Sequence, residues 1–424
     1  MEPSKNGRQG LLGSRPARVG ILIASLQPGG AERAALGLLE GFHAAGVETY
    51  LLTLDGNQAM VPTADGATGE LLAQRIIRLS AADIGRGTIS KTLSGPLQWL
   101  KLRRTVRRLE LDVVLSIMER ANIMNLLGAG SRRRIVSIRS FPSMLLQSKT
   151  PLKRFLVVNL YRALLRRADR VVFVSREAAA DFERLFPAIV GRGSVIYNAC
   201  NIDRLHQLAA EPIPEPFEHI FDRPVVIAAG RLNAEKGHWC LVRAFRELAR
   251  RNDDARLVVI GDGPLRDDLV RLRDELGLAN RVFFPGFQSN PLSWVARSRV
   301  FVLPSSWEGF PNSLLEAMAL HVPVVSSDCR SGPRELMAPE SDPEQKTNGI
   351  DETPAGYLVP PPNGVRHPAA EGPTREELFF AEAIEKAMQR AAADGVSKHA
   401  ARERLTGFTR EAIIPRWLDV IREP

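Results

Sequence analysis

The sequence predicts an α/β protein with two doubly wound domains, each a parallel sheet covered by helices on both faces. The chain has 424 residues, which is enough for two separate cores. Short β-branched runs alternate with helix-length amphipathic stretches, and this alternation stops in a polar, Pro-rich stretch, residues 211–223, and then starts again. The runs are continuously apolar, which is typical of parallel strands buried on both faces.

The first series of strands and helices is expected to form an N-terminal domain of residues 18–205, after a polar tail of residues 1–17. A linker of residues 206–223 would follow it. The intervening segments have helical periodicity, so they are expected to be the helices of a doubly wound fold. The strands are expected at Arg18 to Ala24, Glu48 to Thr53, Asp112 to Ser116, Ile135 to Ile138 and Arg170 to Ser175.

The second series is expected to form a C-terminal domain of residues 224–406. Residues 337–374 are rich in Pro, Gly, Glu and Asp, and they are expected to form a long loop that includes one short strand at 355–359. The other strands are expected at Val225 to Ala229, Leu257 to Ile260, Val282 to Phe284, Val300 to Leu303 and Val322 to Ser326.

Residues 407–424 are expected to form a final amphipathic helix. Their apolar side chains recur near helical spacing. These side chains are Phe408, Ile413, Trp417 and Ile421.

Charge is distributed unevenly along the chain, whose formal net charge is +9. Up to Asp203 there are 29 Lys and Arg against 16 Asp and Glu, whereas the remainder has 28 against 32. The basic surface therefore belongs to the first half. Nucleic acid, an anionic membrane surface or a phosphate-bearing substrate would each be attracted by it, and charge alone does not choose among them.

Cysteine usage and hydropathy predict a cytoplasmic protein. Cys200, Cys240 and Cys329 show neither a pairing pattern nor metal-ligand spacing, which indicates a reducing compartment. The apolar run from Val19 to Leu26 is far shorter than the roughly 20 residues that span a bilayer. Neither a signal peptide nor a transmembrane helix is therefore expected.

Residues 305–320 read SSWEGFPNSLLEAMAL and link a strand end at Leu303 to a helix expected to begin near Ser313. A helix N-terminus at the carboxyl edge of a sheet offers free N–H groups and a positive dipole end, which suit a phosphate. Two carboxylates, Glu308 and Glu316, flank this point with seven residues between them. A structural role is open for one of them, because Ser313 and Glu316 have the spacing of a capping box.

Two cations follow the first strand of the second domain, in the segment AGRLNAEKG of residues 229–237. Arg231 offers a planar fork of N–H donors, and Lys236 offers a compact point charge. Together they would neutralise a leaving diphosphate. The alternative is a solvated turn, which is the usual place of charged loop residues.

Two glycine-containing loops follow other strands. Gly261-Asp262-Gly263-Pro264 begins like a dinucleotide fingerprint, but Arg266 occupies the place of the third glycine, which excludes nicotinamide binding there. Pro264 is expected to open a helix. In the first domain, Gly29 and Gly30 link the first strand to the first helix. Paired glycines let a backbone approach a ligand closely, or they form only a flexible turn.

Taken together and in this order, these segments resemble the retaining glycosyltransferases of the GT-B fold, specifically the family-four group with its Glu-x7-Glu motif. The resemblance spans nearly the whole chain and includes VIYN, residues 195–198. It implies two Rossmann-like domains that face a central cleft, with the donor bound by the second and the acceptor by the first. It also implies that the C-terminal helix crosses back to the first domain.

The resemblance also implies roles for individual residues. Arg231, Lys236 and Glu308 would form the catalytic set, with both cations on the donor diphosphate and Glu308 facing the hydroxyls of the transferred sugar. Glu316 would hold the ribose hydroxyls. The other donor-binding residues would be Gly29, Gly30, Asn122, Asn198, Gly230, Gly263, Phe310, Pro311, Asn312, Ser313 and Leu314.

Catalysis of this kind stabilises the departing nucleotide diphosphate with positive groups. No metal and no other cofactor is therefore expected. Asp-x-Asp metal ligation belongs to the other main glycosyltransferase fold, and the sequence contains no such motif.

One position departs from the family pattern. Many members carry a histidine just after the fourth strand of the first domain, where this chain reads IMERAN, residues 117–122. Glu119, Arg120 or Asn122 is therefore expected to take over contacts with the donor sugar. This variant, with GGAER at 29–33 and SGPRE at 331–335, resembles a branch that builds bacterial surface glycans from UDP-sugars on lipid-diphosphate acceptors.

The basic half of the chain is then expected to meet an anionic membrane. Trp99, Leu102, Val106 and Leu109 fall on one face of a predicted helix, and this face would either rest on lipid or pack on the sheet. The basic residues nearby are Lys101, Arg103, Arg104, Arg107, Arg108 and Arg132 to Arg134.

The expected function is retaining transfer of a hexose or N-acetylhexosamine from a nucleotide-sugar, expected to be UDP-linked, to a lipid-linked or oligosaccharide acceptor in bacterial polysaccharide biosynthesis. A sugar-nucleotide epimerase or a phosphorylase would share the architecture, and a basic nucleic-acid or anionic-surface binding protein would share the charge. An aromatic content of 6% provides few platforms for stacked bases, so nucleic acid is not expected as a partner. The protein is expected to be cytoplasmic and peripheral on the inner face of the membrane.

Overall fold

The computed structural model describes residues 17–27, 29–56, 60, 66–80, 95–147, 150–393 and 405–423. All but the last residue of the tail expected at 1–17 lies outside these ranges. The chain divides into two compact units, the first of residues 1–137, 164–170 and 421–424 and the second of residues 138–163 and 171–420. This division assigns 138–163 and 171–205 to the second unit, so the domain boundaries drawn from the sequence stay a prediction.

Seven strands form the first sheet, in the order β3-β2-β1-β4-β5-β6-β7. β1 pairs in parallel with β2 on one side and β4 on the other, which is the reversal of strand order found in doubly wound folds. All five predicted strands are present, and β3 and β7 are additional. The strand bounds are β1 (Arg18–Ile23), β2 (Glu48–Thr53), β3 (Ile76–Arg78), β4 (Val113–Ile117), β5 (Arg133–Ile138), β6 (Arg170–Phe173) and β7 (Gly193–Val195).

Helices connect these strands, as the helical periodicity of the intervening segments predicts. Their bounds are α1 (Gly30–Ala44), α2 (Gly66–Gln74), α4 (Gly95–Arg108), α5 (Glu119–Leu126), α6 (Pro142–Gln147), α7 (Pro151–Leu164), α8 (Arg176–Leu185) and α9 (Ile202–Ala210).

The second sheet also has seven strands, in the order β10-β9-β8-β11-β12-β14-β13. It is parallel except for β13, which pairs antiparallel with β14. The five strands predicted in this half are present, the short strand predicted at 355–359 is β14, and β13 is additional. The strand bounds are β8 (Val225–Ala229), β9 (Arg256–Ile260), β10 (Val282–Gly286), β11 (Val300–Leu303), β12 (Val324–Ser327), β13 (Asp351–Thr353) and β14 (Gly356–Val359).

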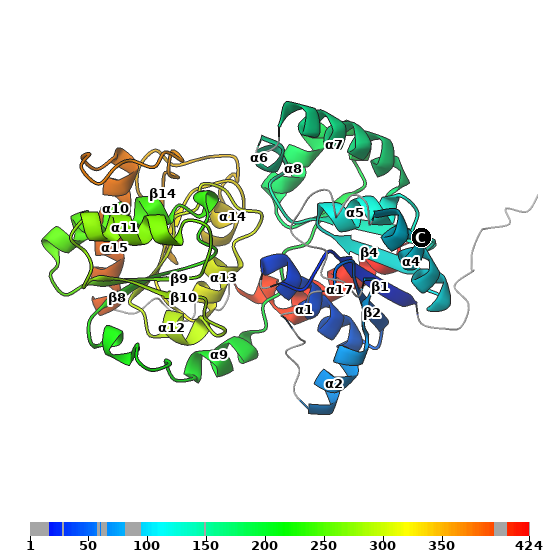
Figure 1. Ribbon diagram of the computed structural model, residues 1–424, viewed down its shortest axis with the longest axis horizontal. Coiled ribbons are helices and arrows are strands. Elements are labelled where there is room, and N and C mark those ends of the chain that lie inside the picture. Colours follow the sequence, from blue (N-terminus) through cyan, green and yellow to red (C-terminus); the bar gives the residue numbers. More distant parts are fainter. Residues whose placement is uncertain are drawn as a thin grey trace, which may run out of the picture. The chain divides into compact units, whose positions relative to one another are not determined.

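Both faces of the second sheet are buried, because alternate residues of each strand enter different cores. In β8, Val225 and Ile227 belong to one apolar cluster, whereas Val226 and Ala228 belong to another. Figure 1 shows α10, α11 and α15 on one side of this sheet and α12 on the other. The helix bounds are α10 (His238–Arg251), α11 (Arg266–Glu275), α12 (Leu292–Ala296), α13 (Asn312–Ala319), α14 (Pro333–Met337) and α15 (Arg375–Ala393).

The chain ends in α17 (Arg410–Arg422). Within the first unit, Arg133 Nη1 donates to the carbonyl of Ile421 at 2.9 Å, and Arg170 pairs with Glu423 at 2.7 Å. Arg133 and Arg170 are the first residues of β5 and β6, so the last residues of the chain are tied to the first sheet.

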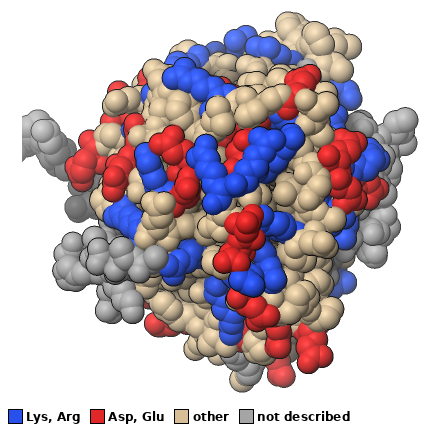
Figure 2. Space-filling model, turned by 90° about the vertical axis from the view of Figure 1, so that its left-hand side faces the viewer, with Lys and Arg blue, Asp and Glu red and all other residues tan. Residues whose placement is uncertain are grey.

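The surface of the second unit carries both signs of charge. In Figure 2, which shows the side of the molecule formed by that unit, patches of Lys and Arg are interspersed with Asp and Glu. Residues 204–424, most of which belong to this unit, include 28 basic and 32 acidic residues. No helix in the described ranges is long and apolar enough to cross a membrane.

Candidate active site

A charged pair stands at the carboxyl edge of the second sheet, where β8 and β11 end beside each other. Lys236 Nζ lies 2.7 Å from Oε1 and 2.9 Å from Oε2 of Glu308. Ser305 Oγ donates to the same Oε1 at 2.6 Å. The Glu308 side chain is almost fully buried, whereas that of Lys236 is about one quarter exposed at 27%. The structure therefore brings together two of the three predicted catalytic residues.

Glycine geometry places Lys236 in this position. After β8 the chain makes a short turn, Ala234–Lys236, and Gly237 adopts the left-handed conformation with φ of 67°. A Cβ atom on Gly237 would come within 1.9 Å of the carbonyl oxygen of Pro304. Only glycine lets the loop after β8 approach the end of β11 this closely.

The Glu308 backbone is held from the loop that follows β12. Its N–H donates to the carbonyl of Arg330 at 2.5 Å, and its own carbonyl accepts from the N–H of Ser331 at 3.2 Å. Ser331 Oγ donates to the carbonyl of Gly309 at 2.8 Å. Gly309 in turn fits closely, because a Cβ there would lie 2.0 Å from the carbonyl oxygen of Arg139. The loop that carries Glu308 is therefore fixed from two sides.

The surroundings of the Lys236–Glu308 pair shift the pKa values of Lys236, His238 and Cys329. Burial lowers the pKa of Lys236, but the adjacent Glu308 carboxylate more than offsets this, so the pKa lies above its ordinary value. Burial, and then the Lys236 cation, lower the pKa of His238 to about 3. Burial, and then the Glu308 carboxylate, raise the pKa of the Cys329 thiol. At neutral pH Lys236 is thus charged, whereas His238 and Cys329 are neutral.

Arg231, the third predicted catalytic residue, makes no ion pair or side-chain hydrogen bond with Lys236 or Glu308. Its side chain is exposed, and no described residue makes an ion pair or a side-chain hydrogen bond with it. The adjoining backbone is well supported, since Leu232 N–H donates to the carbonyl of Asp262 at 3.0 Å. A Cβ on Gly263 would come within 2.5 Å of the Leu232 carbonyl. The predicted Gly263 therefore packs against the loop of Arg231 and keeps it in place.

The helix after Glu308 begins close to the predicted position but is capped differently. α13 starts at Asn312, and its N-cap is Pro311, which has no side-chain capping bond. Ser313 lies inside the first turn, so the capping box proposed for Ser313 and Glu316 is wrong. Proline at this point cannot supply a capping side chain, and the first turn is instead closed by the Leu314 N–H, which donates to the Pro311 carbonyl at 3.1 Å.

The side chains along this turn divide into core and surface. Leu314 is fully buried and Phe310 is nearly so, with the Phe310 ring 5.5 Å from Tyr197 between centroids. Their side chains belong to the core, which leaves only backbone atoms for a ligand. Glu316 is half-buried. The pKa of the Cys200 thiol is raised to about 12, first by burial of the thiol and then by the negative charge of Glu316.

A polar chain that the sequence did not predict leads to the first residue of α13. Asn198 Nδ2 donates to Asn312 Oδ1 at 2.6 Å, and Arg139 Nη1 donates to Asn198 Oδ1. Burial lowers the pKa of Arg139 to about 10. Asn198 and Asn312 were both predicted donor ligands, and the structure joins them directly. The signal for Arg139 in the sequence was its place directly after a strand, at Ile138.

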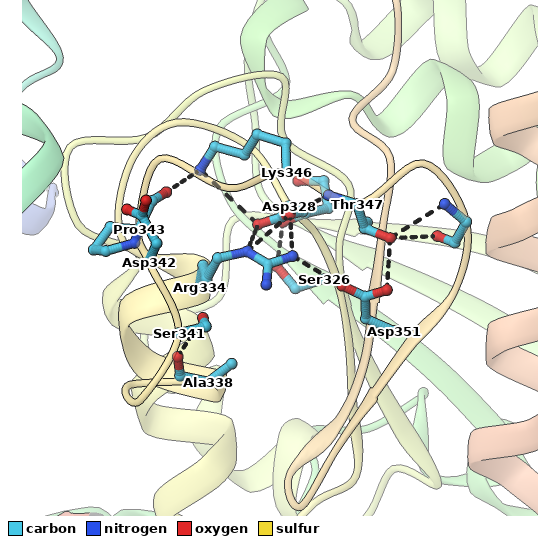
Figure 3. A network of polar contacts seen from close by, with 12 residues as sticks. Ser326, Asp328, Arg334, Ala338, Ser341, Asp342, Pro343, Lys346, Thr347 and Asp351 are labelled. Carbon is cyan, nitrogen blue, oxygen red and sulfur yellow. Dashed lines mark hydrogen bonds and ion pairs between the residues drawn. The ribbon is translucent and has the colours of Figure 1, made fainter.

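The loop after β12 rests on a buried ion pair that the sequence also missed. Arg334 donates from both Nε and Nη2 to the Asp328 carboxylate, and Nη2 also reaches Asp351 at 2.9 Å. Asp328 is fully buried, and it further accepts from the Thr347 N–H at 2.7 Å. Figure 3 shows Asp328 at the centre of these contacts, with Lys346 beside it. This cluster fixes the loop whose Arg330 carbonyl holds Glu308.

Glu335 accepts three hydrogen bonds. The backbone N–H groups of Arg176 and Glu177, at the start of α8, donate to it at 2.9 and 3.2 Å. Tyr197 Oη donates at 2.9 Å. A carboxylate at a helix N-terminus is favourable, because it compensates the unpaired N–H groups and the dipole. The SGPRE segment is thus used for support through Arg334 and Glu335.

In the first unit, the predicted glycines begin a helix. Gly29 is the N-cap of α1, and Gly30 is its first residue. A Cβ on Gly29 would meet the Glu32 carboxylate at 2.4 Å. Burial raises the pKa of Glu32. The Gly29 backbone is extended and the Glu32 side chain can move away, so this contact does not by itself require glycine at 29. Ligand contact by Gly29 and Gly30 stays a prediction.

The position without the expected histidine is built from packed side chains. Asn122 is fully buried, and its Nδ2 donates to the Ser137 carbonyl at 3.1 Å, which disfavours direct contact with a ligand. Arg120 pairs with Asp55 at 2.8 Å. Just before α5, Met118 has φ of 73°, a conformation that non-glycine residues adopt at a cost and that is common near functional sites. Roles of Glu119 and Arg120 in sugar contact stay predictions.

Family profiles match both halves of the chain. The family described as "Glycosyltransferase Family 4" matches residues 28–204, and "Glycosyl transferases group 1" matches residues 211–363. Each match contains the loops described above for its half of the chain. The chain is a glycosyltransferase whose two halves each match a glycosyltransferase family.

This chain is similar in sequence to other glycosyltransferases. It is 29% identical over 325 residues to an N-acetylgalactosamine-N,N'-diacetylbacillosaminyl-diphospho-undecaprenol 4-alpha-N-acetylgalactosaminyltransferase of Campylobacter jejuni, with 75% of this chain and 83% of the relative covered. It is 31% identical over 249 residues to an uncharacterized glycosyltransferase of Methanocaldococcus jannaschii, where the match covers 57% of this chain and 61% of the relative.

The solved structures that resemble this glycosyltransferase have the GT-B fold, as predicted. The Anabaena protein HepE, solved in complex with UDP and glucose, superposes with a TM-score of 0.71, and the alignment covers 96% of this chain and 100% of that one. The two sequences are 20% identical, so this likeness establishes the fold alone.

Proposed function

We propose that this glycosyltransferase transfers a hexose or N-acetylhexosamine from a UDP-sugar to a lipid-linked or glycan acceptor in bacterial polysaccharide biosynthesis, with retention at the anomeric carbon. The name of the Campylobacter relative, which specifies a diphospho-undecaprenol acceptor, supports the lipid-linked acceptor. The Anabaena structure, which contains UDP, supports the donor base.

The observation that carries the proposal is the Lys236–Glu308 pair at the end of β8 and β11. Carboxyl ends of parallel strands are where doubly wound sheets bind ligands. A diphosphate that binds Lys236 would share this cation with Glu308. The carboxylate would then accept hydrogen bonds from sugar hydroxyls while the ammonium stabilises the leaving group.

The neighbouring residues complete this arrangement in our proposal. Arg231 is exposed and keeps its donors available for a second phosphate. Glu316 lies one helical turn after Asn312, so both face the same side of α13, where Glu316 would accept from the ribose hydroxyls. Positive side chains and the α13 N-terminus would neutralise the leaving group, so we propose that no metal ion is needed.

A thermal-shift screen of nucleotide-sugars tests the donor. At about 100 times its dissociation constant, a ligand stabilises the fold by about 2.7 kcal/mol. We expect UDP-sugars to raise the melting temperature of the parent and to leave that of Lys236→Ala unchanged. Stabilisation of Lys236→Ala equal to that of the parent would refute the phosphate site.

A transfer assay tests the reaction. With a lipid-diphosphate acceptor, we expect product formation that continues in excess EDTA. Loss of transfer in EDTA, restored by a divalent cation, would contradict the metal-free proposal. Conversion of the UDP-sugar without any acceptor would indicate an epimerase.

We also propose that the enzyme is a peripheral protein of the inner face of the cytoplasmic membrane. A lipid-diphosphate acceptor resides there, and the basic first half of the chain carries the charge to approach an anionic surface.

A further inference from the structure

Helix α7 leaves an apolar face uncovered. Leu152 is 68% exposed, Phe155 65% and Leu156 57%, and the three residues stand at positions i, i+3 and i+4 of one helical face. Leu160, one turn further on, is 39% exposed. Isolated exposed leucines are ordinary, but a row of large apolar side chains on one helix marks an interaction surface.

The opposite face of α7 is firmly packed, so the exposed row belongs to an anchored helix. The Tyr161 ring lies 6.3 Å from Phe182 and 5.9 Å from Phe186 between centroids, and both phenylalanines lie in or just after α8. Figure 1 shows α7 running beside α8. Tyr161 is itself buried. The helix therefore presents its apolar row to the outside from a fixed position.

Cations accompany this apolar row, and acids do not. Lys153, Arg154 and Arg162 are exposed on α7, which contains no Asp or Glu. The wider segment of residues 149–167 has six Lys or Arg and no acidic residue. An apolar face on a helix that carries cations and no acids is complementary to an anionic lipid surface, where acyl chains receive the apolar groups and phosphates receive the cations.

We propose that the α7 surface, formed by Leu152, Lys153, Arg154, Phe155 and Leu156, docks on an anionic lipid bilayer. The helix lies in the plane of the interface, with the apolar side chains below the level of the phosphates. The long stems of Lys153 and Arg154 let their charged ends reach those phosphates while the stems stay in apolar surroundings. This inference rests on the peripheral attachment in the proposed function, and it assigns that attachment to one helix.

The helix that the sequence singled out for this role is used differently. In α4, Leu102 and Val106 are buried in a core cluster against which Trp99 and Leu109 pack. The apolar face predicted there is therefore core, as the alternative interpretation stated. α4 still exposes Leu97 at 58% and Leu100 at 45%, which makes it a matched control surface.

Vesicle sedimentation of the full chain tests the proposal. Vesicles of phosphatidylcholine with phosphatidylglycerol are compared with vesicles of phosphatidylcholine alone. We expect the parent to bind the anionic vesicles at least tenfold more tightly and to lose affinity with added salt. Leu152→Ser/Leu156→Ser is expected to lower the binding about tenfold, whereas Leu97→Ser/Leu100→Ser changes it less than twofold.

The charge contribution is tested separately. Lys153→Ala/Arg154→Ala is expected to weaken binding to anionic vesicles about fivefold for each cation, as expected for basic residues near an anionic surface. Equal binding of parent and both α7 variants would overturn the proposal. It would also be overturned if the parent were a dimer in light scattering and Leu152→Ser/Leu156→Ser made it monomeric without changing vesicle binding, because α7 would then join two copies.

Two further measurements separate this inference from the proposed function. UDP-sugar thermal shifts of the α7 variants should equal that of the parent, which shows that the fold and donor site are intact. A water-soluble acceptor analogue should be glycosylated at the same rate by parent and variants. Loss of vesicle binding in the α7 variants, with the UDP-sugar thermal shift and the rate on the soluble acceptor both unchanged, supports docking by α7. Absence of UDP-sugar binding in the parent would refute the donor proposal, and the vesicle result would then be interpreted independently of it.

Discussion

Lys236 Nζ lies 2.7 Å from Oε1 and 2.9 Å from Oε2 of Glu308, and Ser305 Oγ donates to Oε1 at 2.6 Å. The cation follows β8 and the carboxylate follows β11, which are neighbours in the sheet. Residues 72 positions apart are thus joined because parallel strands end at one edge. The carboxylate keeps the ammonium charged, and the ammonium in turn orients the carboxylate.

Replacing Glu308 should damage turnover more than donor binding. Glu308→Gln keeps the shape but removes the charge that would accept hydroxyl hydrogen bonds as the sugar bond breaks. We expect kcat/KM to fall about 100-fold, close to 3 kcal/mol, with a change of less than tenfold in the dissociation constant of UDP-sugar. Steady-state kinetics and calorimetry measure the two. Glu340→Gln, at an exposed position, is the control, and parental kcat/KM in Glu308→Gln would contradict the role.

His238 should make the fold sensitive to mild acid. Its pKa in the folded protein is about 3, because it is buried and adjoins the Lys236 cation, whereas an unfolded histidine has a pKa of about 6.5. Between these values the unfolded chain binds a proton that the folded chain does not. Stability therefore falls as pH falls from about 6.5 towards 3, by about 1.4 kcal/mol per pH unit.

The expected loss is about 2 kcal/mol between pH 6.5 and 5 from this residue alone. Urea unfolding at the two pH values measures it. In His238→Gln this part of the pH dependence should be absent, whereas His206→Gln, at an exposed position, should retain it. An unchanged pH dependence in His238→Gln would show that another group is responsible.

The strands were predictable where burial dictates composition. β8 and β11 occupy the predicted ranges, Val225 to Ala229 and Val300 to Leu303, because a strand covered on both faces must be apolar throughout. The missed strands are short and lie at sheet edges. β13 reads Asp351-Glu352-Thr353 and pairs on one side only, so its sequence carries no apolar run.

The site was predictable where chemistry requires a particular residue type, and less so where packing decides. Lys236 and Glu308 could be found from their loops. The burial of Asn122 and the ion pair of Asp328 and Arg334 could not, because both depend on chains that meet only in three dimensions. The capping box predicted for Ser313 is wrong because Pro311 is the N-cap and the helix starts at Asn312, which places Ser313 inside the first turn.

Glycine at 309 should be required for both stability and activity. A Cβ there would lie 2.0 Å from the carbonyl oxygen of Arg139, a backbone atom that cannot rotate away. Gly309→Ala is expected to destabilise the protein by about 1 to 3 kcal/mol and to displace Glu308. Gly349→Ala, where a Cβ would meet nothing within 4 Å, should have an effect below about 0.5 kcal/mol. Thermal unfolding and the transfer rate are measured for both, and equal values for the two variants would refute the close fit.

Asp328 should be the most costly single side chain to remove from the supporting loop. It is fully buried and makes the fully buried ion pair with Arg334, which is 4% exposed, so Asp328→Ala would leave this buried cation with only the more exposed Asp351 as its ion-pair partner. Breaking such a pair from one side costs about 3 to 5 kcal/mol.

Asp254→Ala provides the matched control, because Asp254 pairs with Arg223 at the surface, where an ion pair contributes about 0 to 1 kcal/mol. The free energy of unfolding in urea is compared for the two variants. Because the Asp328 cluster fixes the loop whose Arg330 carbonyl accepts from the Glu308 N–H, Asp328→Ala should also lower kcat at a temperature where it is still folded. Stability loss with parental kcat would separate the two roles and show that Glu308 is held without this cluster.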